Sequence, residues 1–308
     1  MEAIFLLQLK NALMLGCQYA LIAIGFTLFF GVLNVVVFCH GDFAYVALFI
    51  ATALISVVLG INFGTSFLRG VLIILFLFVA MAFTGFIGVV VERVIIRPLR
   101  TAPSLMPLLI TAATGIFLEQ VLKNFYPQGS NPQTFPLDFD RTVIRAGGFD
   151  MSVMEILILV ITLFLFLFMF YFIKKTRIGA QIEAISQDFE AASMMGINVN
   201  RGISITFFIG ASLAAIAGFM NGMYYSVFRY DMGAMAGIKG FSASVVGGLG
   251  SIFGAIMGGF LMAFVETFAS AYIPGASQFR DVFSFLVVLL FLIFRPSGIL
   301  GEQLQEKV

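Results

Sequence analysis

About eight apolar segments, most of them long enough to cross a bilayer, constrain this chain more than any other feature. A helix needs about 20 consecutive apolar residues to cross the hydrocarbon core of a membrane. The hydrophobicity here is continuous, whereas the strands of a transmembrane barrel alternate between apolar and polar residues. We therefore predict an all-α, polytopic membrane protein. The segments lie near residues 12–37, 43–60, 67–91, 105–126, 152–173, 203–227, 241–272 and 281–294.

The composition excludes several other classes of protein. Of the 308 residues, 61% are hydrophobic and 11% are charged, which leaves too little polar surface for a soluble globule. A net charge of +1 gives no support to nucleic-acid binding. Cys17 and Cys39 lie in apolar surroundings and are expected to be buried thiols without a disulfide framework. No signal-peptide cleavage pattern follows the N-terminus, so the first apolar run is expected to be a retained helix. Residues 1–308 are predicted to form one transmembrane domain.

Two apolar regions are interrupted by residues that break helices. The early interruption is FCHGDF at residues 38–43, and the late one is GGLGSIFG at residues 247–254. Their roughly matching places in the two halves suggest an internal repeat with broken or re-entrant helices, an arrangement found around translocation pathways. We expect Gly41 to interrupt the helix at the early break, so that it lines a translocation path together with His40 and Asp42.

Two further carboxylates fall within apolar segments. Charged residues at membrane depth are costly, so they usually serve a function. Glu119 lies four residues before Lys123, and we expect the two to form a boundary pair on the aqueous side. The sequence favours neither a functional nor a structural role for Glu266.

The distribution of lysine and arginine gives an orientation. The polar island at residues 174–202 and the loop at residues 92–103 are both rich in these residues, which places them in the cytoplasm. Residues 127–151 then lie outside. Arg295 and Lys307 favour a cytoplasmic C-terminus, and the N-terminus is not assigned.

Within the island, DFEAASMMG predicts a short helix. Asp188 is suited to cap its N-terminus and Gly196 to end it in a left-handed conformation. Such a helix is a rigid element suited to docking on another protein, and the alternative is an ordered surface loop. Phe189, Ala192 and Met195 are expected to share one side of it. The candidate docking residues are Asp188, Phe189, Glu190, Ala191, Ala192, Met195 and Gly196.

Small residues recur at a spacing of four in two apolar segments. Such rows allow helix backbones to approach closely, so we interpret them as packing seams. Packing within the chain is the favoured interpretation, and a subunit or moving interface is the alternative. The seam residues are Gly210, Ala214, Gly218 and Gly222 in one segment and Gly250, Gly254 and Gly258 in a later one.

The sequence offers no candidate catalytic or metal-binding residues. The P-loop pattern GxxxxGK[ST] is absent, so nucleotide binding through such a loop is not expected. The single histidine, His40, excludes an HExxH motif and leaves little for a metal site. No GxSxG nucleophile elbow occurs. We therefore expect no catalysis by this chain alone.

Five stretches, in order, resemble motifs of one transporter family. Over essentially its full length the chain resembles the membrane permease subunits of ATP-binding-cassette importers for branched-chain amino acids. The stretches are YALIAIGFTLFFGVLNVVVFCHGDF (19–43), ERVIIRPLR (92–100), SQDFEAASMMGINVNR (186–201), FSASVVGGLGSIFGAIMGG (241–259) and FRPSGILG (294–301).

The chain departs from the usual residues of that family at four positions. Val37 stands where the family usually has Asn and Cys39 where it has Ala, so less polar lining is expected at the early break. Glu183 stands where Arg is common, and Phe253 replaces a common Pro.

The resemblance implies a transport subunit rather than an enzyme. It implies a multi-pass protein of the bacterial inner membrane, surrounded by membrane lipid. The implied partners are a second, homologous permease, two cytoplasmic ATPase subunits and a periplasmic solute-binding protein. No cofactor is expected on this chain, because ATP and Mg would bind to the ATPase subunits. The helix at 188–196 would dock in a groove of an ATPase subunit, and the substrate would cross between the two permeases.

Other functions stay open beside import of leucine, isoleucine and valine. A permease for urea or short amides would share the same motifs. An ion-coupled secondary transporter would need no ATPase, but the scarcity of intramembrane carboxylates and the helix-forming island count against it. A purely structural scaffold would not need two helix breaks. The sequence does not indicate which amino acid is preferred.

Overall fold

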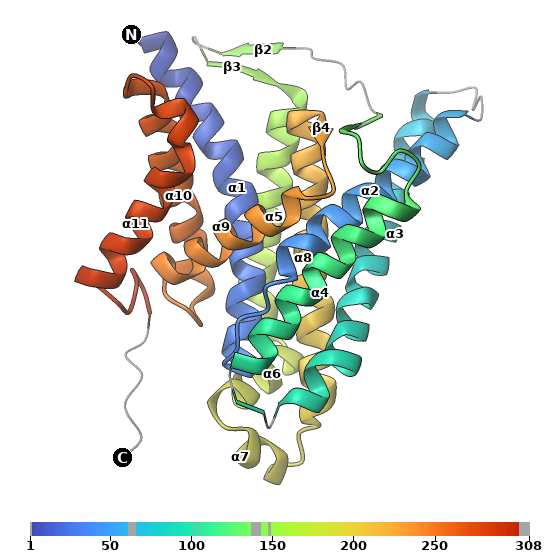
Figure 1. The fold of residues 1–308 in the computed structure, drawn as a ribbon, viewed down its shortest axis with the longest axis vertical. Helices are drawn as coiled ribbons and strands as arrows, with labels where there is room; N and C mark the ends of the chain where they lie inside the picture. Colours follow the sequence, from blue (N-terminus) through green and yellow to red (C-terminus); the bar gives the residue numbers. More distant parts are fainter. Residues whose placement is uncertain are drawn as a thin grey trace.

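The computed structural model describes residues 2–60, 66–100, 102–103, 105–136, 143–146 and 149–301, which form a long helical bundle (Figure 1). The α-helices are α1 (Glu2–Leu33), α2 (His40–Gly60), α3 (Ser66–Val91), α4 (Leu105–Phe125), α5 (Val153–Lys175), α6 (Arg177–Gln187), α7 (Phe189–Met194), α8 (Val199–Tyr225), α9 (Met232–Gly247), α10 (Ile252–Tyr272) and α11 (Arg280–Phe294). The shorter turns are the π-helical η1 (Glu92–Ile96) and the 3-10 turns η2 (Arg97–Leu99) and η3 (Ala276–Phe279). The strands are β1 (Gln133–Thr134), β2 (Val143–Ala146), β3 (Phe149–Ser152) and β4 (Val227–Phe228), paired antiparallel as β1–β4 and β2–β3.

The prediction of an all-α polytopic membrane protein is confirmed. Within the described residues, eight helical spans are long and apolar enough to cross a membrane. The predicted segment at 241–272 contains the end of α9 and the whole of α10, so it is not one continuous crossing.

The centre of the bundle is formed by α1 and α8. Of their membrane-spanning windows, 89% and 83% are buried within the chain, against 17% for α5 and 11% for α11. Helix α1 packs against α8, α9 and α10, and α8 also packs against α2 and α3. The peripheral helices therefore present most of their apolar surface outward, as expected for contact with lipid.

Glycines allow α8 to approach its neighbours closely. A β-carbon at Gly210 would collide with the Phe29 ring on α1, and one at Gly222 would collide with Leu48 on α2. In the later row, Gly254 and Gly258 in the same way face the backbone of α9. Both rows thus contribute to packing within the chain. Gly250 lies in the turn before α10, so the expected row is wrong at this position.

The early break precedes the position that the sequence predicts. Helix α1 ends just before Asn34, whose φ of +54° is left-handed, and residues 34–39 are non-helical. Helix α2 begins at His40, so Gly41 lies within its first turn. The predicted break near 38–43 therefore exists, but it begins four residues earlier and overlaps the predicted stretch only at residues 38–39. The helix ends at an asparagine, a residue that tolerates left-handed backbone angles better than most others do.

The late break agrees with the predicted interruption at residues 247–254. Residues 248–251 separate α9 from α10. Gly248 and Gly250 have φ values of +107° and +93°, which side-chain-bearing residues rarely adopt. The Ser251 hydroxyl then caps α10 by accepting a backbone hydrogen bond.

The C-terminal tail covers the end of α9. The N–H groups of Ile299 and Leu300 donate to the carbonyl oxygens of Val246 and Gly247, both at 2.9 Å. Carbonyl groups at a helix end have no partner within the helix, so the tail satisfies two of them. The late break and the tail form one packed unit.

The two predicted cytoplasmic segments lie at the same end of the bundle. Turn η2 lies near α6 and α7 at the lower end of Figure 1, and Arg100 donates a 2.8 Å hydrogen bond to Asn200. Strands β2 and β3 lie at the opposite end. The assignment of the lower end to the cytoplasm rests on the lysine and arginine distribution and stays a prediction.

The polar island contains a second helix, α6, that the sequence analysis did not identify. Thr176 caps α6 by accepting a 3.0 Å hydrogen bond from the N–H of Gly179. Ile182 and Ile185 are buried against the bundle. Their spacing, one turn apart, is the signal in the sequence that indicates this helix.

Candidate functional site

The first turn of α2 is held between two other helices. A β-carbon at Gly41 would collide with the carbonyl oxygen of Gly233 and the backbone of Gly237, both on α9. On the other side, a β-carbon at Gly218 of α8 would collide with the carbonyl oxygen of Ala44. Only glycine permits such close backbone contact. The start of α2 and the backbone of α9 are therefore in direct contact.

His40 ties α2 to α1 and is fully buried. Its Nε2–H donates to the carbonyl oxygen of Ile22 at 3.1 Å. The edges of the Phe26 and Phe29 rings surround the imidazole, with centroids 4.8 and 4.9 Å away. Gly25 leaves the space that the imidazole fills. The geometry therefore gives His40 packing contacts within the chain, and its place on a translocation path stays a prediction.

Asp42 occupies a narrow space between α4 and α9. Its side chain is 4% exposed, and a β-carbon at either Gly115 or Gly233 would collide with one of its carboxylate oxygens. The carboxyl group of Glu119 lies close enough to interact electrostatically with that of Asp42. Two acidic groups thus meet beside the Gly41 contact, at the junction of three helices.

The expected pair of Glu119 with Lys123 is wrong. Both side chains belong to the described part of the chain, and no ion pair joins them. The Lys123 amine instead lies 5.6 Å from the centroid of the Tyr230 ring, and Glu119 turns toward Asp42. A helical spacing of four does not decide which neighbouring helix attracts each side chain.

Glu266 is the centre of a buried polar cluster. Its side chain is 1% exposed and accepts from Lys239 at 2.9 Å and from Nε of Arg280 at 2.7 Å. The hydroxyl groups of Tyr19 and Ser284 donate to its second oxygen at 2.9 and 2.7 Å. Each oxygen of this carboxylate therefore accepts two hydrogen bonds. These bonds stabilise the charged form of Glu266 within an apolar segment.

The Glu266 cluster joins four helices. Its members come from α1, α9, α10 and α11. Lys239 also forms an ion pair with Asp281 of α11, at 2.5 Å. Two cations thus balance two carboxylates. The sequence alone indicates no role for Glu266 because its partners are distant in the chain, although Lys239 beside an apolar run is an available signal.

Helix α7 has the caps that the sequence indicates. The Asp188 carboxylate accepts from the N–H groups of Glu190 and Ala191 at 2.8 and 3.0 Å. Gly196 has a left-handed φ of +80° just after the helix. The element is thus short, rigid and sharply ended.

The exposed face of α7 differs from the expected one. Ala192 is only 4% exposed and packs toward the bundle, whereas Met194 and Met195 are 88% and 83% exposed. Phe189, Ala192 and Met195 therefore do not form one exposed face, because Ala192 points toward the bundle and Met195 points outward. Six residues form less than two turns, so small changes in helix rotation decide which side chain points inward.

Phe189 connects α7 to the early break. It borders a hollow of about 180 Å³ whose wall also contains Leu33 and Val35, at the end of α1. Ile96 of η1 and Arg100, just after η2, also line this hollow. Helix α7 and the segment that leads into α2 therefore face the same hollow.

Glu92 fixes the loop that faces α7. It is fully buried and forms ion pairs with Arg97, at 2.9 Å, and with Arg100. Ser204 of α8 donates to the same carboxylate at 2.7 Å. The stretch ERVIIRPLR thus forms a turn that is stabilised by its own ion pairs. The sequence does not indicate the contact of Glu92 with Ser204, because Ser204 is far along the chain.

Comparison with known proteins gives matches over nearly the whole chain. Residues 8–292 match the family described as "Branched-chain amino acid transport system / permease component". The chain is 36% identical to the high-affinity branched-chain amino acid transport system permease protein BraD of Pseudomonas aeruginosa, over 99% of this chain and 98% of that protein. It is 34% identical to the LivH permease protein of the corresponding system in Escherichia coli, with the same coverage of each. It is 27% identical to a probable branched-chain amino acid transport permease protein LivH of Methanocaldococcus jannaschii, over 95% and 91% of the two chains. No solved structure gives a significant match.

Proposed function

The chain belongs to the family of branched-chain amino acid transport permeases, and we propose that it carries leucine, isoleucine and valine across the inner membrane as a subunit of an ATP-driven importer. The observation that carries this proposal is the identity of more than a third with BraD over 99% of the chain. Eight candidate membrane spans support the same role, as does the capped helix α7 at the basic end of the bundle, which is the end with the lysine- and arginine-rich segments 92–103 and 174–202.

The proposed assembly contains four further subunits. A second, homologous permease would share the membrane, two ATPase subunits would lie in the cytoplasm and would bind ATP and Mg, and a periplasmic solute-binding protein would deliver the substrate. The position of α7 supports contact with an ATPase subunit, because Met194 and Met195 leave a large apolar surface exposed at the basic end of the bundle. Flexible methionine side chains suit such a docking contact.

The proposed coupling runs from α7 to α9. ATP-driven closure of the ATPase subunits would displace α7, and Phe189 would pass the displacement to Leu33 and Val35. The segment at 34–39 leads into α2, where Gly41 contacts the backbone of α9 without intervening side chains. The α2–α9 contact in particular has little free volume to absorb a displacement, because the two backbones touch.

The proposed output of this coupling is the exposed face of α9. Met232, Met235 and Ile238 lie along this face and are 40%, 43% and 38% exposed. A shift of α9 would change the apolar surface offered to the second permease. Substrate would cross at that interface, and its selectivity would reside mainly in the solute-binding protein.

Uptake of radiolabelled leucine tests the substrate. The purified complex, reconstituted in vesicles with its co-purifying subunits and ATP, is expected to take up leucine. Excess unlabelled isoleucine or valine should compete, whereas excess urea should not.

A permease for urea or short amides is the alternative substrate class. Uptake of radiolabelled urea, with no uptake of radiolabelled leucine, would establish that alternative and contradict the proposal. The names of the matched relatives favour branched-chain amino acids.

A further inference from the structure

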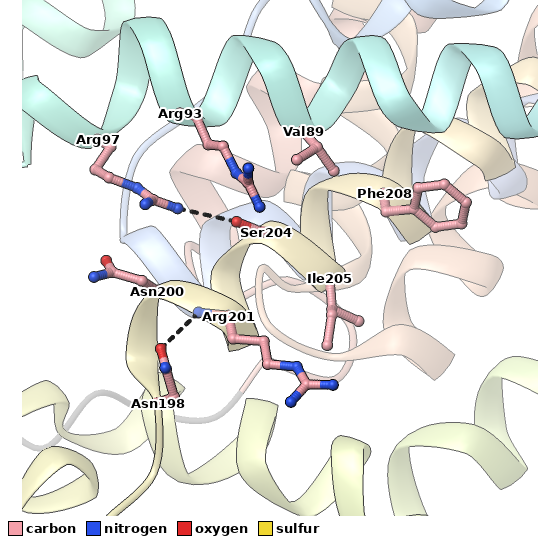
Figure 2. A pocket seen from close by; sticks show the side chains of 9 residues that line it. All are labelled: Val89, Arg93, Arg97, Asn198, Asn200, Arg201, Ser204, Ile205 and Phe208. Carbon is pink, nitrogen blue, oxygen red and sulfur yellow. Dashed lines mark hydrogen bonds between the residues drawn. The ribbon is translucent and has the colours of Figure 1, made fainter.

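A basic pocket lies between α8 and the end of α3, on the side of the bundle that carries the cytoplasmic loops. Its volume is about 450 Å³, and Figure 2 shows the side chains that line it. One wall comes from α3, η1 and η2, and the other comes from the first turns of α8 and the residues before it. The lining residues are Val89, Arg93, Arg97, Asn198, Asn200, Arg201, Ser204, Ile205 and Phe208.

The polar part of the pocket is strongly cationic. Three of its nine lining residues are arginines, and none is acidic. Arg97 shares the buried carboxylate of Glu92 with Arg100, so this carboxylate is already matched by two cations. In the part of the chain that the structure describes, Arg93 and Arg201 take part in no ion pair. The pocket therefore has two guanidinium groups available for an anion.

The rest of the pocket is apolar. Val89 precedes Arg93 by one turn, and Ile205 follows Arg201 by one turn, so the two antiparallel walls change from basic to apolar in the same direction (Figure 2). Phe208 extends the apolar part and is 39% exposed. On α3, the neighbouring Phe86 and Val90 are 61% and 41% exposed on the surface expected to face lipid. The pocket is thus continuous with the membrane-facing surface.

This combination fits one class of ligand. A guanidinium group presents forked donors that match phosphate oxygens, and basic pockets between helices at the cytoplasmic face suit anionic headgroups. The apolar part would contact the first carbons of the acyl chains, a contact that a free phosphate ion does not offer. We propose that this pocket binds an anionic phospholipid, with its phosphate between Arg93 and Arg201.

Equilibrium lipid binding by native mass spectrometry tests this proposal. The probes are dioleoyl phosphatidylglycerol and dioleoyl phosphatidylcholine, which have identical acyl chains, added to the delipidated full-length protein. The wild-type protein should prefer phosphatidylglycerol. Because each cation near the membrane surface contributes on the order of 1 kcal/mol, the double variant Arg93→Gln/Arg201→Gln should bind phosphatidylglycerol about thirty-fold more weakly. Its binding of phosphatidylcholine should fall less, because the choline cation offsets the phosphate charge, so the preference for phosphatidylglycerol should be lost.

The matched control removes the same charge elsewhere. Arg177 and Arg295 are exposed, lie outside the pocket and belong to the predicted cytoplasmic side. The variant Arg177→Gln/Arg295→Gln should therefore retain the phosphatidylglycerol preference. Equal phosphatidylglycerol binding by the pocket variant and the wild type, or equal loss in both variants, would overturn the proposal.

A second measurement uses only the wild-type protein. Phosphatidylglycerol should slow hydrogen–deuterium exchange in residues 198–204 relative to phosphatidylcholine. The same protection by inorganic phosphate alone would make this a small-anion site and overturn the assignment to lipid. No protection by phosphatidylglycerol would also overturn it.

Discussion

At the scale of single residues, the most consequential polar group is Glu266. Its buried carboxylate neutralises the buried Lys239 and the partly exposed Arg280, and two hydroxyl groups complete its hydrogen bonding. Removing one member of a buried ion pair is far more harmful than removing the whole pair, because the remaining charge is left without compensation.

We expect Glu266→Gln to lower the free energy of unfolding by about 3 kcal/mol, the lower end of the cost of breaking a buried pair, because Lys239 loses its buried partner but retains Asp281, and Arg280 is partly exposed. Denaturant titration of the protein in detergent measures this change in the free energy of unfolding. The control is Glu183→Gln, which removes the carboxylate of the exposed pair with Lys174 and should cost less than about 1 kcal/mol. Equal stability losses in the two variants would contradict the role given to Glu266.

Gly41 is the residue on which the α2–α9 contact depends. We expect Gly41→Ala to reduce leucine uptake strongly and to cost about 1–3 kcal/mol, because the added carbon meets the α9 backbone. Gly31→Ala is the matched control, since a β-carbon at Gly31 meets no other atom within 4 Å. Uptake per assembled complex is the measurement, and normal uptake by Gly41→Ala would remove the contact from the mechanism.

At the scale of elements, α7 carries the proposed contact with the ATPase through Met194 and Met195. We expect Met194→Glu to leave the fold intact, because this side chain is 88% exposed, and to abolish retention of the ATPase on purification. Met194→Leu, which conserves volume and apolarity, should retain the ATPase. Retention by both variants would show that α7 is an ordinary surface element.

The structure changes the effect that we expect from replacing Ala192 with a charged residue. The sequence predicts a docking-face residue there, so that Ala192→Arg would disrupt docking alone. Because Ala192 is buried, this variant would disturb the packing of α7 itself and would not isolate the contact.

The sequence predicts the existence of the membrane-spanning helices better than it predicts the residues at which they begin and end. Long apolar runs identify the spans because bilayer thickness sets their length. The early break was predicted too late in the chain because Gly41 resembles a helix breaker, whereas it serves a close contact with a helix nearly 200 residues later in the chain. Such contacts, like the partners of Glu266, depend on tertiary structure that a local pattern does not contain.

At the scale of the whole molecule, the sequence could not distinguish the central helices from the peripheral ones. All spans are strongly apolar, since lipid and protein interior both accept apolar side chains. The small residues of α8 were the one available signal of central packing, and they do lie against α1 and α2.

The orientation of the bundle gives a prediction at the same scale. A cysteine at Gln187 should react with a membrane-impermeant maleimide only from the cytoplasmic side, and one at Asn131 only from outside. The native Cys17 and Cys39 are buried and should contribute little background. Labelling of both sites from the same side would contradict the orientation and, with it, the proposed contact of α7 with the ATPase.

The most direct test of the central claim is the energy source for leucine uptake. Vesicles containing the purified complex are supplied either with internal ATP or with an imposed ion gradient, each with and without the ATPase subunits. We predict uptake only when ATP and the ATPase subunits are both present, and no effect of a protonophore. Gradient-driven leucine uptake by vesicles without the ATPase subunits would contradict the account and establish an ion-coupled transporter.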